Sequence, residues 1–188
     1  TKMIAITHLS NVTGGISPLD EIIELAKSKR IPVLIDGTQG APHLKIDVQK
    51  LDCDFYVISC HKMYGPNGLG ILYGKKKWLD LFEPYQGGGG MIGEVKKDKI
   101  TYAETPTKFE AGTMQTAEVV SFAESIRFIE NLGFKNISDH ENEIMNYGIE
   151  KLSKINSIKI IGGPKKKSSV ISFTMNNIHP HDIATILD

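Results

Sequence analysis

Cysteine is scarce in this chain: its 188 residues include only two, Cys53 and Cys60. With no second pair and no Cys-x-x-Cys spacing, the sequence suggests neither a disulfide framework nor a structural zinc site. Net charge is also missing, because 22 Lys and Arg residues balance 22 Asp and Glu residues. This balance removes the electrostatic argument for nucleic acid or an anionic membrane as the main partner. We therefore predict reduced thiols and no nucleic-acid partner.

Long apolar runs are missing as well. No stretch approaches the roughly 18 apolar residues that a membrane-spanning helix needs, and the first residues do not form a secretory signal. We expect a cytoplasmic protein with no membrane partner. The hydrophobic and charged fractions, 40% and 23%, are ordinary for a globular protein. Both ends of the chain cut through element patterns, so we expect a segment of a longer protein.

The first part of the chain alternates strand and helix signals. After a strand at about 3–7, Ser17-Pro18-Leu19-Asp20 provides a cap, a proline at the first helical position and an acid, a typical helix start. Buried strands are predicted at 33–35, 55–59 and 69–73, and a short helix follows Asp47 at 48–51. This order predicts a βαβ unit and a mostly parallel sheet with flanking helices.

The second part has a different texture. Four glycines, Gly87–Gly90, begin a long loop with one short strand that extends to about residue 113. Helices are predicted at 117–131, ended by Gly133, and at 138–154. The remaining elements suggest a smaller α+β domain. They are a strand at 158–161, a turn at Gly162–Pro164, a solvated basic run at Lys165–Lys167, a strand at 170–174 and a helix after Pro180. We place the domain boundary near residue 132.

Polar residues follow three of the predicted strands. In open parallel sheets ligands bind beyond the carboxyl ends of the strands, and these ends carry His8–Asn11, Asp36–Gln39 and Ser59–Lys62. A partly desolvated lysine can form a Schiff base with a carbonyl, and pyridoxal phosphate enzymes combine such a lysine with an acid on the pyridinium nitrogen. The alternative for Lys62 is an ordinary solvated lysine. Three polar strand ends in succession favour a shared site.

Five stretches together resemble the SUF-type cysteine desulfurases, class V members of the fold-type I pyridoxal phosphate enzymes. They are Asp36–Gln39, Leu51–Val57, Ser59–Pro66, Gly87–Ile92 and Phe109–Thr113, in family order along the chain. The Asp-Gly-x-Gln and Ser-x-His-Lys pair is specific for the class, and the last two stretches narrow the resemblance to the desulfurases. It implies an α/β fold, with 1–132 as part of the large cofactor-binding domain and 133–188 as the beginning of a small, truncated C-terminal α+β domain.

The resemblance implies a role for each residue around the cofactor ring. Lys62 holds pyridoxal 5'-phosphate and moves protons at the substrate α-carbon. Asp36 pairs with the pyridinium nitrogen, and Gln39 hydrogen-bonds the phenolic oxygen of the ring. Asn11 sits beside that oxygen and the substrate carboxylate.

The resemblance also implies how the phosphate is bound. Ser59 and His61, which precede Lys62, bind the phosphate. Thr113 reaches the phosphate of the cofactor in the partner subunit. The enzyme is therefore expected to be a homodimer with shared sites.

The implied reaction converts L-cysteine to L-alanine and passes persulfide sulfur to an acceptor protein of the SUF system for iron–sulfur cluster assembly. The family's first phosphate-binding loop, its ring-stacking histidine, its nucleophilic cysteine and its substrate-binding arginine have no counterpart in these residues. The isolated chain is therefore expected to bind cofactor weakly and to be inactive. Alternatives are another class V enzyme, such as a selenocysteine lyase or an aminotransferase, or a catalytically inactive fragment.

Three positions depart from the family pattern. Cys60 stands where a small residue is usual, Met114 where proline is frequent, and Thr38 where alanine is usual. Pairing Cys60 with His61 as a nucleophile is disfavoured, because neighbours on an extended segment point to opposite faces. Cys53 reads as a small buried hydrophobe.

The remaining histidines carry weaker signals. His179-Pro180-His181 fits the start of a helix better than a metal site, because no carboxylate or thiol stands at ligand spacing. His8 could orient a substrate or cap its strand, and His43 has no assigned role. No metal ligand is predicted.

Overall fold

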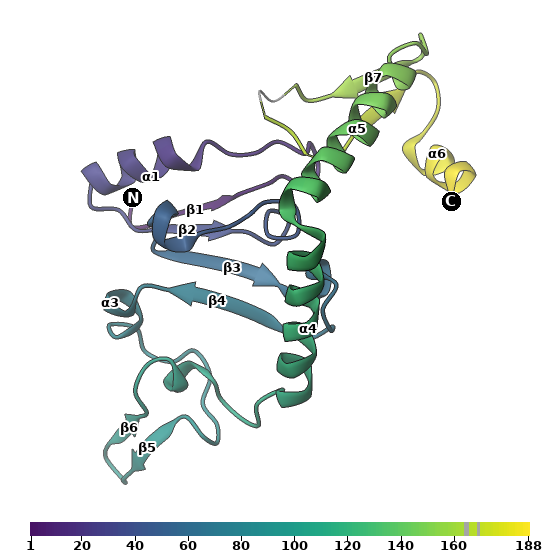
Figure 1. Cartoon of the computed structure of the whole chain (residues 1–188). Helices are drawn as coiled ribbons and strands as arrows, with labels where there is room; N and C mark the ends of the chain where they lie inside the picture. The colour runs from purple at the N-terminus through teal and green to yellow at the C-terminus, as the bar shows by residue number, and fades with distance from the viewer. Residues whose placement is uncertain (164–165, 169) are drawn as a thin grey trace.

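The computed structural model describes residues 1–163, 166–168 and 170–188. Its main sheet has the strand order β1-β2-β3-β4 (Figure 1). The strands are β1 (Ile4–Thr7), β2 (Val33–Asp36), β3 (Phe55–Ser59) and β4 (Gly70–Gly74). β1, β2 and β3 are parallel, and β4 runs antiparallel to β3. The predicted α/β architecture with a mostly parallel sheet is thereby confirmed.

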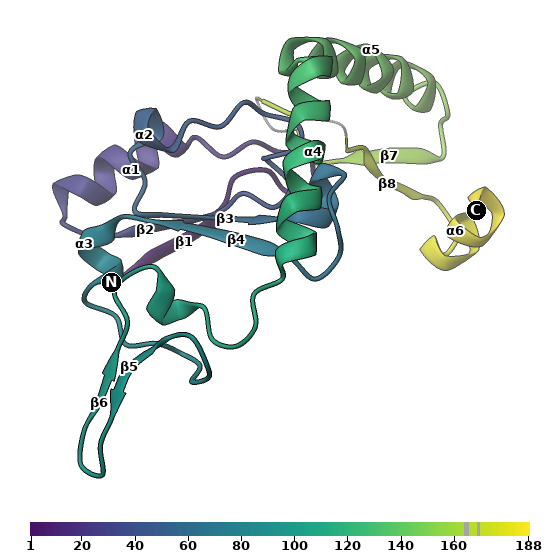
Figure 2. The same cartoon turned by 60° about the horizontal axis from the view of Figure 1, so that its bottom comes forward.

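Helices α1 (Leu19–Ser28) and α2 (Val48–Leu51) lie on one face of this sheet (Figure 2). The core beneath them joins buried side chains of α1 to buried side chains of β2 and β3, together with Cys53: Leu19, Ile23, Ala26, Val33, Ile35 and Tyr56. A crossover helix that packs on two parallel strands is the βαβ unit that the sequence predicts. Cys53 is a buried hydrophobe, as expected.

The opposite face of the sheet is largely open. Thr7, Asp36, Val57 and Leu72 are partners in successive strands and so share this face. Thr7 and Asp36 are exposed, and Leu72 keeps 54% of its surface accessible. The prediction of a buried strand at 69–73 is therefore wrong: β4 is an edge strand, and its apolar run could not reveal what covers it.

The start of α1 also differs from the prediction. The Ser17 hydroxyl donates to the carbonyl of Thr7 at 2.7 Å instead of capping the helix. Asp47 does cap α2, because its carboxylate accepts from the backbone N–H groups of Gln49 and Lys50, both at 3.0 Å. The Ser17 hydroxyl thus links the start of α1 to β1, whereas Asp47 caps its helix in the way that the sequence predicts.

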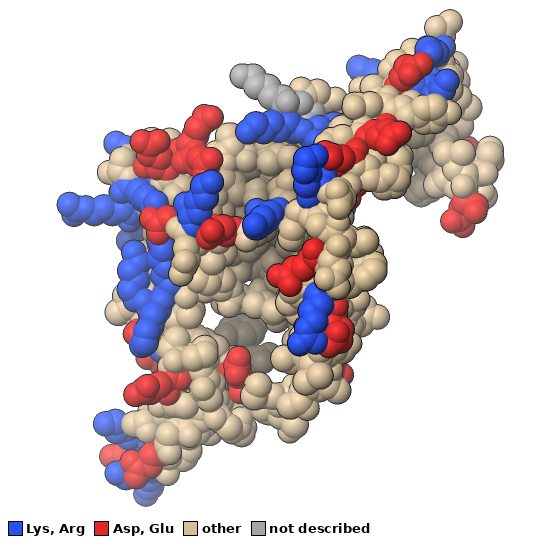
Figure 3. All heavy atoms as spheres, in the orientation of Figure 1, with Lys and Arg blue, Asp and Glu red and all other residues tan. Residues whose placement is uncertain are grey.

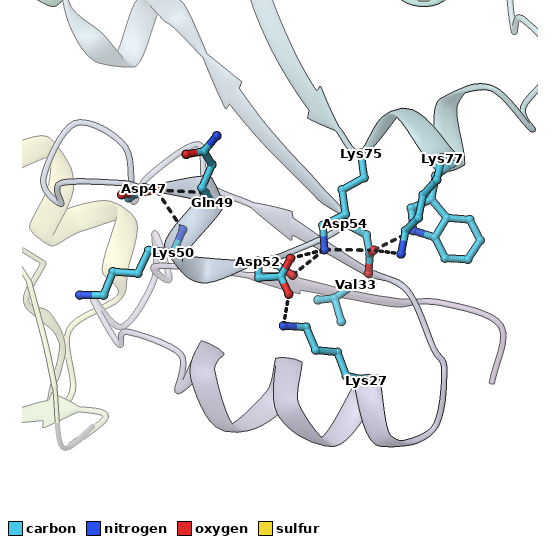
Figure 4. A network of polar contacts seen from close by, with 10 residues as sticks. Lys27, Val33, Asp47, Gln49, Lys50, Asp52, Asp54, Lys75 and Lys77 are labelled. Atoms are coloured by element: carbon cyan, nitrogen blue, oxygen red, sulfur yellow. Dashed lines mark hydrogen bonds and ion pairs between the residues drawn. The ribbon is translucent and has the colours of Figure 1, made fainter.

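A buried carboxylate closes the edge where the parallel strands begin (Figure 4). Asp54 accepts from the backbone N–H of Val33 at 3.0 Å and from the indole N–H of Trp78 at 2.7 Å. Trp78 belongs to the short helix α3 (Lys76–Leu79). Lys75 and Lys77 each bring their Nζ to 3.7 Å from the same carboxylate. Asp54 therefore joins β2, β3 and α3 at one point.

Cations gather around this edge. Figure 3 shows blue side chains along the left side of the molecule, where α1 ends and α3 begins. Hydrogen bonds from Lys27 and Lys75 hold the pKa of Asp52 down at about 2. Lys27, Lys75 and Lys77 are therefore paired with carboxylates, which is a structural arrangement.

The second half begins with a hairpin of β5 (Ile92–Val95) and β6 (Ile100–Tyr102) that projects from the body (Figures 1 and 2). The sequence predicted one short strand in a loop. Helix α4 (Thr116–Leu132) ends at Gly133, whose φ of 81° confirms the predicted stop. Helix α5 (Phe134–Leu152) begins directly after this glycine, four residues before the predicted start at 138, because the turn is completed within Gly133 itself.

The chain ends in β7 (Ile158–Ile161), β8 (Ser172–Met175) and α6 (Pro180–Leu187), with β7 and β8 antiparallel. His179 caps α6, because its ring accepts from the backbone N–H of His181 at 3.2 Å, so the helix-start interpretation is confirmed. Pro164 of the predicted turn and Lys165 of the predicted basic run lie outside the described residues.

The described residues contain neither a membrane-spanning helix nor a metal-ligating cluster. No helix in them has the length and apolar character to cross a bilayer. They also contain no group of three or more His, Cys, Asp or Glu side chains that could hold a metal ion.

Candidate functional site

The carboxyl ends of β1, β2 and β3 meet at one edge of the sheet. Asp36 is the register partner of Val57, so Ser59 lies two residues farther along the neighbouring strand and on the same face. Strand geometry places the Cα atoms of Asp36 and Ser59 about 8 Å apart. The segments that carry six of the seven predicted site residues therefore begin side by side.

Asp36 opens a compact turn over residues 37–44. Its exposed carboxylate accepts from the backbone N–H of Thr38 at 3.0 Å. Within the turn, Ala41 N donates to Gly37 O and Leu44 N donates to Gly40 O, both at 2.8 Å. Gln39 is half-buried in this turn, so its backbone is fixed by the same bonds that fix the exit from β2.

The turn rests on a partly buried histidine–tyrosine pair. His8 Nδ1 and the Tyr56 hydroxyl are 2.8 Å apart, and the backbone N–H of His8 donates to Asp36 O at 2.8 Å. A Cβ on Gly37 would lie 1.9 Å from the Tyr56 ring, and one on Gly40 would lie 3.0 Å from the His8 ring. Burial lowers the pKa of His8, so the ring is neutral at pH 7. His8 therefore supports the turn.

Lys62 lies on the 3-10 turn η1 (Cys60–Met63), which follows β3. In such a turn residues three apart eclipse one another, so Cys60 and Met63 are buried while His61 and Lys62 are exposed. The Ser59 hydroxyl lies 2.9 Å from His61 Nδ1. Within the described ranges, the side-chain amine of Lys62 has no hydrogen-bond or ion-pair partner.

Cys60 and His61 diverge, as expected, although the segment is a 3-10 turn and not an extended strand. Burial raises the pKa of the Cys60 thiol. A protonated thiol that faces the core beside Phe122 and Ile129 does not serve as a nucleophile. The departure at Cys60 is thus a packing feature.

Helix α4 packs against η1. Phe122 and Ile129 pack with Cys60 and Met63 in one buried cluster. A Cβ on Gly65 would lie 2.6 Å from the Phe122 ring, so the chain returns close to α4 immediately after η1. The backbone at Lys62 is therefore held from both sides.

Asn11 and Thr113 lie on separate segments. Asn11 is exposed in a turn whose start is fixed by Ser10, because the Ser10 hydroxyl accepts from the backbone N–H of Thr13 at 3.1 Å. Thr113 is exposed just before α4. In the part of the chain that the structure describes, no hydrogen bond or ion pair joins Thr113 to the edge with Asp36 and Lys62.

One residue of this region had no assigned role from the sequence. His43 Nδ1 lies 2.6 Å from Glu141 Oε1 of α5. Because a carboxylate only accepts, the ring nitrogen carries the proton. The partners are 98 positions apart, so no local pattern could have paired them.

The donor set at this edge fits pyridoxal phosphate. An unpartnered amine at Lys62 matches an aldehyde carbon, the carboxylate of Asp36 matches a protonated ring nitrogen, and the hydroxyl and imidazole of Ser59 and His61 match a phosphate. Asp36 and Ser59 are the last residues of β2 and β3, and His61 and Lys62 follow directly in η1, so all four groups lie at the carboxyl ends of the strands, where open α/β sheets bind ligands.

Comparisons with known proteins give one consistent result. The model of the aminotransferase class V family matches residues 1–188. A probable cysteine desulfurase of Halalkalibacterium halodurans is 45% identical over 188 residues, and a cysteine desulfurase of Serratia proteamaculans is 43% identical over 189 residues. Each alignment covers 100% of this chain and 46% of the relative. The crystal structure of a cysteine desulfurase from Escherichia coli superposes with a TM-score of 0.93 at 35% identity, covering 99% of this chain and 46% of that one.

Proposed function

The chain belongs to the aminotransferase class V family, and from this membership we propose that it is part of a pyridoxal phosphate-dependent cysteine desulfurase. The chain spans 46% of the length of the curated relatives that it matches. The observation that carries the proposal is the sheet edge where Asp36 and Lys62 lie exposed on segments that leave neighbouring parallel strands. The proposed reaction of the whole protein converts L-cysteine to L-alanine.

Each side chain at this edge has a proposed task. Lys62 holds the cofactor at its aldehyde carbon and moves a proton at the substrate α-carbon. Asp36 accepts from the pyridine N–H, which keeps that nitrogen protonated. When bound, the pyridinium ring supplies a sink for the electron pair left by a breaking bond at the α-carbon.

Four further residues orient the cofactor in this proposal. Gln39 donates to the phenolic oxygen of the ring, and Asn11 lies beside that oxygen and the substrate carboxylate. Ser59 and His61 donate to the phosphate. Their 2.9 Å contact supports a joint role, because it already holds the hydroxyl and the imidazole together.

We further propose a homodimer in which Thr113 reaches the phosphate of the partner's cofactor. The projecting hairpin supports this, because Val95 and Ile100 keep 63% and 53% of their surface exposed. On α4, Val120 is 70% exposed. Thr113 is exposed and lies between the hairpin and α4 along the chain, so it is accessible to a second copy that contacts these elements. The domain boundary near residue 132 stays a prediction.

We also propose a sulfur acceptor and a cellular compartment for the protein. Persulfide sulfur passes to an acceptor protein of the SUF system for iron–sulfur cluster assembly, and the protein acts in the cytoplasm. Two buried cysteines that form no disulfide support a reducing compartment.

The test uses the full-length protein purified with pyridoxal phosphate. We expect a visible absorption band and release of alanine from L-cysteine, both abolished in Lys62→Ala. Lys135→Ala, which removes an exposed lysine of α5, is the matched control and should behave as wild type. Identical spectra for wild type and Lys62→Ala would refute the role of Lys62. Bound cofactor without alanine release from cysteine would refute the desulfurase assignment.

A further inference from the structure

The loop after β1, which carries Asn11, is fastened to the C-terminal part of the chain. Its backbone pairs with residues 166–168 through two N–H···O bonds of 3.0 and 3.1 Å. The Ser172 hydroxyl donates to the carbonyl of Val12, the neighbour of Asn11. A Cβ on Gly14 would lie 2.4 Å from a carbonyl of the 166–168 segment. The contact is therefore close enough to require glycine.

The turn after β2, which carries Gln39, is fastened to the same part of the chain. Ala41 belongs to a buried cluster against which Phe134 and Ile137, in the first turn of α5, also pack. About one turn after Ile137, Glu141 accepts from His43 at 2.6 Å. Both contacts fall on one hydrogen-bonded turn, because His43 N also donates to Gly40 O at 3.2 Å.

The His43–Glu141 pair is suited to hold a position. Both side chains are mostly buried, at 23% and 21% exposure, so water competes weakly for the hydrogen bond. The charged groups Lys166 and Lys167 line the same surface cavity. A charge-assisted bond in this setting fixes the far end of the turn, while the His8–Tyr56 pair supports its beginning.

We propose that Glu141 is a positioning residue for Gln39: acting through His43, it holds the turn from which Gln39 meets the cofactor ring. The C-terminal part of the chain thus sets the geometry of the ring-facing edge. This inference rests on the proposed function, since Gln39 has its task only if the cofactor binds there.

The first experiment needs no cofactor. In the full-length apoprotein, hydrogen exchange of the peptide that covers residues 37–44 is followed by mass spectrometry. In Glu141→Ala we expect this peptide to exchange roughly tenfold faster, as expected for the loss of a charge-assisted hydrogen bond. Glu150→Ala is the matched control, because it removes an exposed ion pair from the same helix. Equal exchange in Glu141→Ala and Glu150→Ala would overturn the proposal.

The second experiment uses the holoenzyme and the pH midpoint of its visible absorption band. We expect Glu141→Ala to shift the midpoint in the same direction as Gln39→Ala, and the double variant to match Gln39→Ala alone. A wild-type midpoint in Glu141→Ala, or shifts that add in the double variant, would refute the coupling to Gln39.

Two further results separate failure of the role of Glu141 from misfolding of a variant and from failure of the proposed function. If Glu141→Ala does not fold, Glu141→Gln and His43→Gln decide by the same comparisons, with smaller expected shifts because an acceptor or a donor is retained. A wild-type protein without a visible band would refute the proposed function and the assignment to Gln39. The exchange experiment would still show whether Glu141 holds the turn.

Discussion

Gly37→Ala is the smallest change with a large expected effect on the candidate site. A Cβ at this position would lie 1.9 Å from Cε1 of Tyr56 and 2.4 Å from its hydroxyl oxygen. The tyrosine ring would have to retreat by about 1.5 Å to reach an ordinary contact of about 3.4 Å. Gly37 has no positive φ, so the requirement for glycine comes from this close approach alone.

The magnitude follows from what holds the ring in place. Tyr56 is 3% exposed within the core, so its retreat overpacks the residues behind it, which typically costs about 1–3 kcal/mol. Its hydroxyl would also lose the 2.8 Å bond to His8, worth about 0.5–1.5 kcal/mol. We expect a total destabilisation of about 2–4 kcal/mol. Cofactor affinity should fall too, because the displaced turn carries Gln39.

The assay is urea denaturation of the full-length apoprotein, with Gly87→Ala as the matched control. Nothing lies within 4 Å of a Cβ at Gly87, so that variant should stay within about 0.5 kcal/mol of wild type. In a Tyr56→Leu background the clashing ring atoms are gone, and Gly37→Ala should then cost less than about 1 kcal/mol. Equal costs for Gly37→Ala in both backgrounds would refute the reasoning.

Three further predictions concern the rest of the fold. Asp54→Ala should lower the free energy of unfolding by about 2–4 kcal/mol in urea denaturation, because the N–H groups of Val33 and Trp78 both lose their acceptor. The lowered pKa of Asp52, about 2, implies stability that is present above about pH 4 and is lost as the pH falls toward 2. Asp52 is half exposed, so screening limits this term to about 1 kcal/mol, and pH-dependent unfolding of Asp52→Asn should lack it. Cys60 should resist maleimide labelling in the native protein and react fully in denaturant, because burial raises its thiol pKa; rapid native labelling would contradict its buried position.

The elements with local signals could be predicted from the sequence. The apolar runs that became β2 and β3 are bounded by polar residues, and burial by a crossover helix explains their composition. Asp47 caps α2 and Gly133 ends α4 because capping depends on residues within one turn. Ligands bind at the carboxyl ends of the strands in open parallel sheets, and this rule likewise predicted that Asp36 and Ser59 lie at one edge of the sheet.

The features that depend on distant partners could not be predicted. His8 meets Tyr56 across 48 positions, and His43 meets Glu141 across 98. Neither pair leaves a periodic pattern, because each is a single contact made by the tertiary fold. The exposure of β4 was missed for a related reason: an apolar strand reads the same whether or not another element covers it.

The two edges of the sheet explain why residue type alone does not identify the site. Lysines and aspartates occur at both. At the edge where the strands begin, Lys27 and Lys75 pair with Asp52, and both carboxylate oxygens of Asp54 accept hydrogen bonds from N–H groups. At the other edge, Asp36 keeps an exposed carboxylate, and Lys62 has no partner among the described residues. Asp54, Lys27 and Lys75 have ion-pair partners at one edge, whereas Asp36 and Lys62 have none among the described residues at the other, and this difference favours the second edge as the ligand site.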